Sequence, residues 1–485
     1  MSTRVVIVGG GLAGLAAAAA LAGRGLQITL LESRPRWGGR ASSFVDQSTG
    51  EVIDNCQHVA LGCCTNFLHF CRSVGLEQCF QRERQLTFIG PDGRSSELRA
   101  TWWPAPLHLA ATFARLGYLS WSEKLRLASG LRALARTDPA NCGDETFADW
   151  LQRYRQPAAV VERFWHVVLV SALSETLDRV DVGHARKVFV DSFLRNREGW
   201  EVWIPTVPLD ELYGTQVEKW LRAAGVDCRR QAGVRQVLAV EPEGRGNSPK
   251  SAAEKVAGVE LRSGERIEAE QVILTVPPHL VAELLPDSWR QHSFVVAAER
   301  LETAPISSVH LWFDRPITSL RHATLVGRLS QWVFNRSAIF PGEATDQSAE
   351  GVAARCYYQV VISASREVDG QPQGATIEKV VAELREIWPA AREAQLMHAR
   401  LVTEHKAVIS MLPGIDRNRP VQRTLISGLK LAGDWTRTGW PGTMEGAVRS
   451  GYLAAQSVLE DLGRGESLVQ PDLPTSFLSR WLLGL

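Results

Sequence analysis

The 485-residue sequence predicts an α/β fold, and three observations support this prediction. Near the N-terminus, a strand-like run, closely spaced glycines and an Ala/Leu-rich helix follow one another in RVVIVGGGLAGLAAAAALAG. Near the C-terminus, a strand, a loop and a helix follow in LKLAGDWTRTGWPGTMEGAVRSGYLAAQSVL. Between them lie further strand-like runs, separated by two long insertions. A sheet assembled from distant segments, with an inserted α+β part, accounts for this order.

The N-terminal glycines have the spacing of a dinucleotide-binding βαβ unit of the Rossmann type. Gly9, Gly11 and Gly14 stand between the strand and the helix, and a second strand ends in Glu32, eighteen residues after Gly14. Gly9 permits the tight turn, Gly11 lets a pyrophosphate approach the backbone, and Gly14 lets the helix pack closely on the strand. The spacing therefore predicts a nucleotide site at this turn.

Neighbouring residues complete the predicted nucleotide contacts. The helix begins at Leu12 and Ala13, where unpaired N–H groups face the phosphates. Glu32 is expected to accept hydrogen bonds from ribose hydroxyls, with Ser33 next to it.

Two further segments favour a flavin over a nicotinamide. Gly38, Gly39 and Arg40 directly follow the Glu32 strand, where paired glycines let the backbone pass close to the cofactor. A helix start aimed at an electron-rich ring stabilises the negative charge that develops when a flavin is reduced. The predicted contacts in the C-terminal segment are Gly433, Asp434, Met444, Glu445, Gly446 and Ala447.

These motifs resemble the flavin-containing amine oxidase and phytoene desaturase superfamily at both ends of the chain. The resemblance implies bound FAD and a discontinuous Rossmann-type FAD-binding domain, in which the backbone near Val234 faces the adenine. Non-covalent binding is expected, because the segment GWPGTMEGA contains no cysteine. No second G-x-G-x-x-G occurs, so no nicotinamide domain is expected and the electron donor is external.

The predicted domains alternate along the chain. The FAD-binding domain comprises residues 1–80, 205–288 and 405–462, and the α+β substrate domain comprises 81–204 and 289–404. The first insertion reads as helical, as in SWSEKLRLASGLRALAR, whereas the second has strand-like runs such as SSVHLWF and RCYYQVVIS. The strands AGVRQVLAVE and EKVAGVELRSG flank a polar loop at residues 242–253, which predicts a hairpin.

Composition limits the partners. Basic and acidic residues nearly cancel to a formal charge of +1, which argues against nucleic acid. Eight cysteines in a chain without a secretory signature indicate reduced thiols and a cytoplasmic location. Residues 463–485 form a tail ending in FLSRWLLGL, which either docks on the protein or rests on the cytoplasmic face of a membrane.

Aromatic residues are concentrated in the first insertion, and both a hydrophobic substrate tunnel and an ordinary aromatic core agree with this composition. The residues concerned are Trp102, Trp103, Phe113, Tyr118, Trp121, Phe164 and Trp165.

The stretch DNCQHVALGC, Asp54 to Cys63, is similar to a block of the squalene-associated hydroxysqualene dehydroxylase branch of the superfamily. Residues 170–214 are also similar to that branch. The resemblance implies a C30 isoprenoid substrate whose allylic hydroxyl is replaced by hydrogen, giving squalene in hopanoid synthesis. Three alternatives stay open: a carotenoid or phytoene-type desaturase, a flavin amine oxidase, and a non-catalytic FAD-binding redox sensor.

Three residues are candidates for the chemistry. His58 or Asp54 could protonate the leaving hydroxyl, His58 because it titrates near neutrality and Asp54 if burial raises its pKa. Each also has a structural interpretation, as a hydrogen-bonded loop residue or a turn brace. Lys406 could orient a water beside the flavin, or it is an exposed lysine.

The cysteines of this region do not predict a metal site, since they lack the ligand spacing of zinc sites. Cys56 stands where the similar block has glycine, so a left-handed backbone there would be strained.

Overall fold

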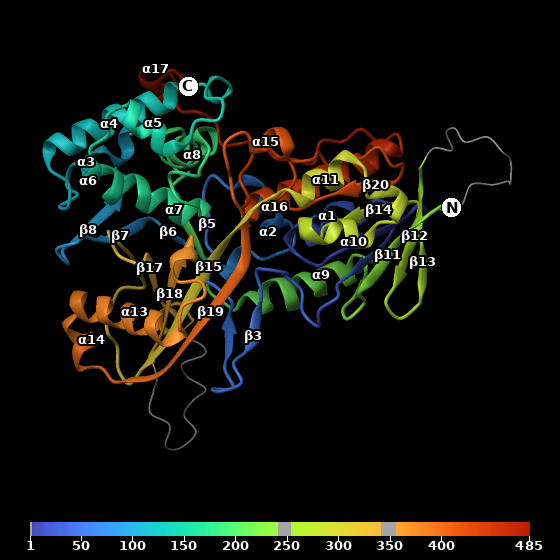
Figure 1. Ribbon diagram of the computed structural model, residues 1–485, viewed down its shortest axis with the longest axis horizontal. Helices are drawn as coiled ribbons and strands as arrows, with labels where there is room; N and C mark the ends of the chain where they lie inside the picture. The colour runs from blue at the N-terminus through green and yellow to red at the C-terminus, as the bar shows by residue number, and fades with distance from the viewer. Residues whose placement is uncertain (1, 241–253, 341–355) are drawn as a thin grey trace.

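The computed structural model describes residues 2–240, 254–340 and 356–485 (Figure 1). The predicted polar loop at residues 242–253 lies outside these residues.

A five-stranded parallel sheet forms the nucleotide-binding part and confirms the predicted α/β class. The strand order is β10-β2-β1-β14-β20. Its central strand has apolar side chains buried on both faces, as expected for a parallel sheet covered by helices. The bounds are Arg4–Val8 for β1, Gln27–Leu31 for β2, Asp227–Arg229 for β10, Gln271–Leu274 for β14 and Leu429–Leu431 for β20. Segments separated by hundreds of residues therefore share one sheet.

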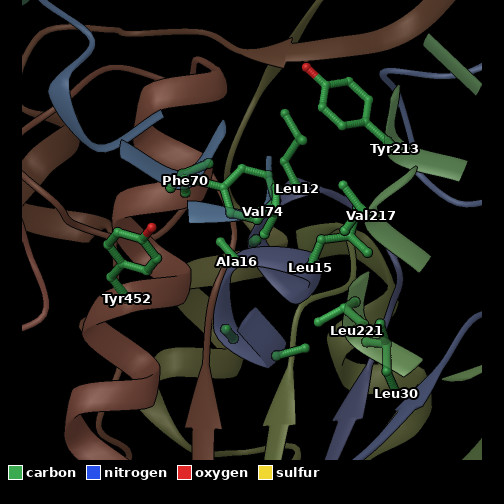
Figure 2. Close-up of a cluster of buried hydrophobic side chains, with 14 of the residues drawn as sticks. Leu12, Leu15, Ala16, Leu30, Phe70, Val74, Tyr213, Val217, Leu221 and Tyr452 are labelled. Carbon is green, nitrogen blue, oxygen red and sulfur yellow. The ribbon is translucent and has the colours of Figure 1, made fainter. Parts of the chain in front are cut away.

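Helix α1 (Leu12–Leu21) lies in the centre of the apolar layer on one face of this sheet, beside α2 (Thr65–Ser73), α9 (Val217–Ala223) and α16 (Met444–Asp461). Gly451 lets α16 approach α1, because a Cβ there would lie 2.3 Å from the Ala13 carbonyl oxygen. Figure 2 shows side chains of α1 between those of α2 and α16 on one side and α9 on the other. The side chains drawn include Leu12, Leu15, Ala16, Phe70, Val217, Leu221 and Tyr452.

The predicted hairpin strands form a separate antiparallel sheet, β11-β12-β13, at one end of the molecule (Figure 1). Helices α10 and α11 pack between it and the parallel sheet in one apolar cluster. The bounds are Val234–Ala239, Val256–Leu261 and Arg266–Glu268 for the strands, and Val281–Leu284 and Ser293–Glu299 for the helices.

The inserted part is built on a seven-stranded sheet of order β19-β15-β18-β17-β16-β7-β8. Its side chains alternate between faces: Val333 and Val360 pack toward α13, whereas Phe334 and Val361 pack toward the helices of the first insertion. The strand bounds are Gln85–Ile89 for β7, Ser95–Arg99 for β8, Thr303–Phe313 for β15, His322–Leu325 for β16, Trp332–Asn335 for β17, Cys356–Ser363 for β18 and Leu396–Ile409 for β19. Helices α13 and α14 span Gln373–Ile387 and Pro389–Glu393, and α12 spans Arg336–Ile339.

The first insertion is mostly helical, as predicted, but it also supplies the hairpin β7–β8 to this sheet. Its longest helix, α4, begins after a capping box in which Ser120 and Glu123 bond each other's backbone N–H groups. The helices are α3 Ala110–Ala114, α4 Trp121–Arg136, α5 Phe147–Arg153, α6 Ala158–Val160, α7 Val167–Leu173 and α8 Val182–Phe189, with π-helical turns at Val161–His166 and Val190–Leu194. A further π-helical turn, Asp210–Gln216, lies after the insertion and leads into α9.

Short strands join the two parts. They are β3 Ser43–Val45 with β4 Val52–Asp54, and β5 Ala60–Leu61 and β6 Phe80–Glu83 on either side of β9 Val202–Pro205. The domain boundaries predicted at 80/81, 204/205 and 404/405 fall inside β6, β9 and β19. The proposed division into domains therefore cuts through strands at all three positions.

The C-terminal tail docks on the first insertion. Its helix α17 (Phe477–Leu483) buries Ser479 and Leu483, and the Ser479 hydroxyl donates to the Leu194 carbonyl at 2.6 Å. Phe477 and Trp481 point outward, 79% and 72% exposed. Among the helices of the described residues, none is long and apolar enough to cross a bilayer.

Candidate functional site

The glycine loop after β1 has the geometry expected for a pyrophosphate cradle. Gly9 has a φ of +112°, and a Cβ on Gly14 would lie 2.0 Å from the Gly9 carbonyl oxygen. A larger residue would therefore be strained at position 9 and would clash with the backbone at position 14. A Cβ on Gly11 would meet no heavy atom within 4 Å, so this glycine keeps open the space in front of the N-terminus of α1. That space suits a diphosphate.

Glu32 holds the loop in place. Its buried carboxylate accepts from the backbone N–H of Gly10 and of Arg34, each at 2.8 Å, and from the Ser33 hydroxyl at 3.2 Å. A carboxylate has further acceptor capacity, so these bonds still allow the predicted contact with a ribose hydroxyl.

The Gly38-Gly39-Arg40 turn packs directly on the glycine loop. The Gly38 N–H donates to the Gly10 carbonyl at 2.8 Å, and a Cβ on Gly39 would lie 3.1 Å from the Gly11 Cα. Arg40 then reaches across the site, donating to the Asp434 carboxylate at 2.5 Å and to the Ala407 carbonyl at 2.7 Å. Its guanidinium therefore joins the first cofactor segment to the last one.

The C-terminal segment places a helix start beside this turn. Gly433 has a φ of +138°, and its N–H donates to the Ser450 hydroxyl of α16 at 2.8 Å. Thr443 caps α16 by accepting from the Gly446 N–H at 3.3 Å. Met444, Gly446 and Ala447 accordingly lie in the first turn of an eighteen-residue helix.

Glu445 was expected to face the cofactor, but its side chain is directed elsewhere. The fully buried carboxylate accepts from the Phe67 N–H at 2.7 Å and from the side-chain amide of Asn66 at 2.9 Å. It thereby caps the N-terminus of α2, where a negative charge is favourable. This residue braces two helices, and only its backbone remains in the helix start.

Val234 begins β11 beside the Glu32 turn. The preceding residues run along that turn, with the Ala232 N–H donating to the Glu32 carbonyl at 2.9 Å and the Gln231 N–H to the Arg34 carbonyl at 3.1 Å. The predicted adenine contact thus lies next to the predicted ribose contact.

Residues 12–459 match the family described as "Flavin containing amine oxidoreductase". The chain belongs to this family. It is an FAD-dependent oxidoreductase, and the glycine cradle, the two helix starts and the Arg40 turn described above fit that cofactor.

Curated relatives and solved structures agree with this assignment. The chain is 27% identical to a 15-cis-phytoene desaturase of Narcissus pseudonarcissus, over 94% of this chain and 79% of the relative. It is 25% identical to a probable zeta-carotene desaturase of Synechococcus elongatus, over 94% and 98%. The structure resembles an oxidoreductase of Methanosarcina mazei, with a TM-score of 0.68, 16% identity, and coverage of 94% of this chain and 100% of the other. It also resembles cyclohexylamine oxidase of Brevibacterium oxydans, with a TM-score of 0.64, 18% identity, and coverage of 96% and 100%.

Asp54 is the anchor of the stretch from Asp54 to Cys63. Its buried carboxylate accepts from the Ser43 hydroxyl at 2.6 Å and the Leu209 N–H at 2.9 Å, and it pairs with the Arg336 guanidinium at 2.5 Å. Arg336 also donates to the Gln57 side chain and lies over the Phe340 ring. Because these contacts tie Asp54 to three different segments, the geometry favours its structural interpretation.

His58 is held two residues beyond Cys56, with its Nδ1 2.9 Å from the Cys56 carbonyl oxygen. A carbonyl only accepts, so Nδ1 carries the hydrogen and Nε2 of the neutral ring is an acceptor. Burial lowers the pKa of His58 from its ordinary value of 6.5, which outweighs the opposing effects of Cys56 and Asp54. The ring is therefore mostly neutral at pH 7.

Lys406 is exposed on β19, next to Ala407, whose carbonyl accepts from Arg40. It lies close enough to His279 to lower the pKa of that imidazole, although burial is the larger cause. Its position beside the Arg40 turn is compatible with the predicted role near the flavin.

Cys56 has ordinary backbone geometry. It is absent from the left-handed residues of the described chain, so the glycine of the similar block is not required here. Burial raises the pKa of its thiol to about 12, with Asp54 adding to the effect. All eight cysteines are free, and no cluster of three or more metal-ligating side chains occurs among residues 2–240, 254–340 and 356–485.

The aromatic residues of the first insertion divide into two groups. Phe113, Tyr118, Phe164 and Trp165 pack in its core, where Trp165 is fully buried. Trp102, Trp103 and Trp121 are 74%, 46% and 68% exposed. The three exposed tryptophans thus lie outside the aromatic core.

The sequence did not reveal Arg336 or Trp37. Arg336 lies in VFNRSAIF, where an arginine within an apolar run is the single available signal. Trp37 packs on Gly10, where a Cβ would lie 2.2 Å from its ring, and only the folded turn shows this contact.

Replacing Gly11 with alanine tests the cradle. The free protein has room for the methyl group, so G11A should keep its thermal midpoint in the FAD-free state, whereas FAD affinity should fall about tenfold to hundredfold through overlap with the pyrophosphate. Titration of flavin-free protein with FAD measures the effect. Gly374→Ala, another glycine with no neighbour within 4 Å, is the matched control. Equal FAD affinity for wild type and G11A would contradict this location of the pyrophosphate.

Removing Arg336 tests the anchor of the Asp54 stretch. Arg336→Met should lower the free energy of unfolding by about 3–5 kcal/mol, because it leaves the buried Asp54 carboxylate unpaired. Asp54→Asn in the same chain should recover about 1–3 kcal/mol of this loss. Denaturant unfolding measures both, and Arg4→Met, which breaks exposed ion pairs with Glu268 and Glu270, should change the free energy of unfolding far less. If the losses of stability caused by Arg336→Met and Asp54→Asn simply added in the double variant, the two side chains would not interact.

Proposed function

We propose that this flavin enzyme reductively removes the allylic hydroxyl group of hydroxysqualene, giving squalene for hopanoid synthesis. The observation that supports the proposal most directly is the position of the Asp54–Cys63 stretch, which is similar to a block of that enzyme branch. Its His58 ring is half-buried and lies within electrostatic range of Arg40, which bonds the flavin-loop residue Asp434. The branch-specific stretch therefore lies beside the predicted cofactor contacts.

The reaction replaces a C–O bond with a C–H bond and consumes one hydride and one proton, releasing water. Bound FAD, once reduced by an external two-electron donor, supplies the hydride. His58 in its protonated form delivers the proton from Nε2 to the departing oxygen, while Nδ1 keeps its bond to the Cys56 carbonyl. The Asp54–Arg336 pair fixes the loop that aims this ring.

Desaturation of an isoprenoid is the second candidate, and two observations favour it. The curated relatives described above are phytoene and zeta-carotene desaturases. In the neutral state that burial favours, His58 also offers Nε2 as a proton acceptor. Desaturation removes a hydride and a proton from the substrate, so it needs oxidised flavin and a base in place of reduced flavin and an acid.

An anaerobic single-turnover experiment distinguishes the two directions. Photoreduced protein mixed with hydroxysqualene should become oxidised while squalene accumulates in equal amount, as measured by flavin absorbance and by chromatography of the extract. Oxidised protein mixed with phytoene should stay oxidised. Flavin reduction by phytoene, without reoxidation by hydroxysqualene, would establish the desaturase instead. The G11A variant without FAD is the control for non-enzymatic conversion.

The pH dependence tests the role of His58. Because its pKa is lowered, the imidazolium becomes populated only below pH 6.5, so the rate of dehydroxylation should rise as pH falls through that lowered pKa. His58→Gln should lose this rise and lower the single-turnover rate by about 10²–10⁴-fold. His405→Gln, at an exposed histidine, should keep the wild-type profile. A rate that instead falls with acid, and only when His58 is present, would identify the ring as a base.

A further inference from the structure

Exposed aromatic side chains gather at the end of the molecule formed by the first insertion and the C-terminal tail. We name as the aromatic rim the residues Trp102, Trp103, Trp121, Leu125, Phe477 and Trp481. They account for six of the fourteen exposed large apolar side chains of the described chain, and for all four exposed tryptophans. Such a concentration marks an interaction surface, because single exposed apolar residues are normally scattered.

Three segments contribute to the aromatic rim, and hydrogen bonds join them. The Ser476 hydroxyl donates to the Ala105 carbonyl at 2.7 Å, which ties the start of α17 to the loop that carries Trp102 and Trp103. Arg136, at the end of α4, donates to the Leu483 carbonyl at 3.2 Å, and α3 and α17 each contact α4. In Figure 1, α3, α4 and α17 lie together at the end of the molecule opposite β11–β13.

The charge around the rim is one-sided. Residues 98–137 contain five exposed arginines and one acidic side chain, whereas the sixth basic side chain, Lys124, is buried. The acid, Glu123, is bonded to Ser120 in the capping box. Arg126 and Arg132 are exposed on α4, whose outward stripe also carries Trp121 and Leu125.

From this arrangement we propose that the aromatic rim docks on the surface of an anionic lipid bilayer. Tryptophan rings favour the depth of the lipid headgroups, and arginines beside them attract anionic lipids. An exposed stripe along α4 suits a helix lying flat on the surface, and none of the described helices can span a bilayer. The inference concerns where the enzyme works, and it holds for either direction of hydride transfer.

A second copy of the chain is a poorer occupant of this surface. A symmetric dimer would place the same patch on both subunits, so the arginines of one copy would face those of the other. Like charges at an interface oppose association, whereas anionic headgroups compensate them.

Vesicle flotation of the FAD-loaded full-length enzyme tests the proposal. Wild type should bind vesicles of phosphatidylcholine containing phosphatidylglycerol at least about tenfold more tightly than vesicles of phosphatidylcholine alone, and salt should weaken the binding to anionic vesicles. Trp121→Ser with Leu125→Ser, and Phe477→Ser with Trp481→Ser, should each weaken binding about tenfold or more. Arg126→Gln with Arg132→Gln should weaken binding to the anionic vesicles on the order of tenfold. Binding to vesicles of phosphatidylcholine alone should not change.

Matched controls separate the rim from general effects. Leu425→Ser removes a side chain that is 84% exposed outside the rim, and Arg235→Gln with Arg266→Gln removes two exposed arginines from the opposite end. Both should bind like wild type, and every variant should keep its FAD and thermal midpoint. Absence of wild-type binding, equal binding by the rim variants, or a dimer that the rim substitutions dissociate without changing vesicle binding would overturn the proposal.

Discussion

The contact between Arg40 and Asp434 is the interaction on which the cofactor site depends. These residues are 394 positions apart, and each follows a strand of the same parallel sheet. Arg40 is fixed by the Gly38-Gly39 turn, which packs on the glycine loop, and Asp434 is fixed by Gly433 and its bond to Ser450. One guanidinium therefore holds the predicted nucleotide end and the predicted flavin end of the site together. The close packing of α1 on α16 through Gly451 is the apolar counterpart of this contact.

The buried pair of Asp54 and Arg336 has a corresponding role between the two parts of the chain. Asp54 ends β4, next to the nucleotide-binding part. Arg336 begins α12, which directly follows β17 of the seven-stranded sheet. Because an unpaired charge in such a position is costly, the two segments are constrained to stay together. The stretch between Asp54 and Cys63, with His58, is consequently placed by a residue from an insertion nearly three hundred positions later.

The proposed reaction site and the proposed membrane-docking surface lie on different parts of the molecule. The proposed reactive group, His58, is half-buried, and this burial lowers its pKa. Trp121 lies on the exposed face of α4, whose buried face contributes Leu127 and Leu134 to the core that contains Trp150, Trp165 and Phe189. Helix α4 thus stabilises the inserted part through one face and presents the proposed interaction surface through the other.

Much of the cofactor site could be predicted from sequence because it depends on local backbone requirements. Gly9, Gly14 and Gly433 have conformations or close contacts that only glycine tolerates, so their spacing identified the turns and the order of strands and helices. The helix predicted from SWSEKLRLASGLRALAR followed from local periodicity, and the structure has it at Trp121–Arg136. The position of β14 in the nucleotide-binding sheet followed from the resemblance to the family.

Tertiary structure alone decided how distant side chains are paired. The carboxylate of Glu445 is directed to α2 instead of the cofactor, and Asp54 is paired with Arg336, because both depend on which segments the sheets bring together. The hairpin β7–β8 joins a sheet formed mainly by the second insertion, a long-range pairing that local periodicity does not encode. The sequence by itself determined the glycine turn between β1 and α1, since that turn is a local backbone property. The protonation of the site and the faces presented to solvent were decided by the fold, since burial and charge pairing exist only after distant segments have packed.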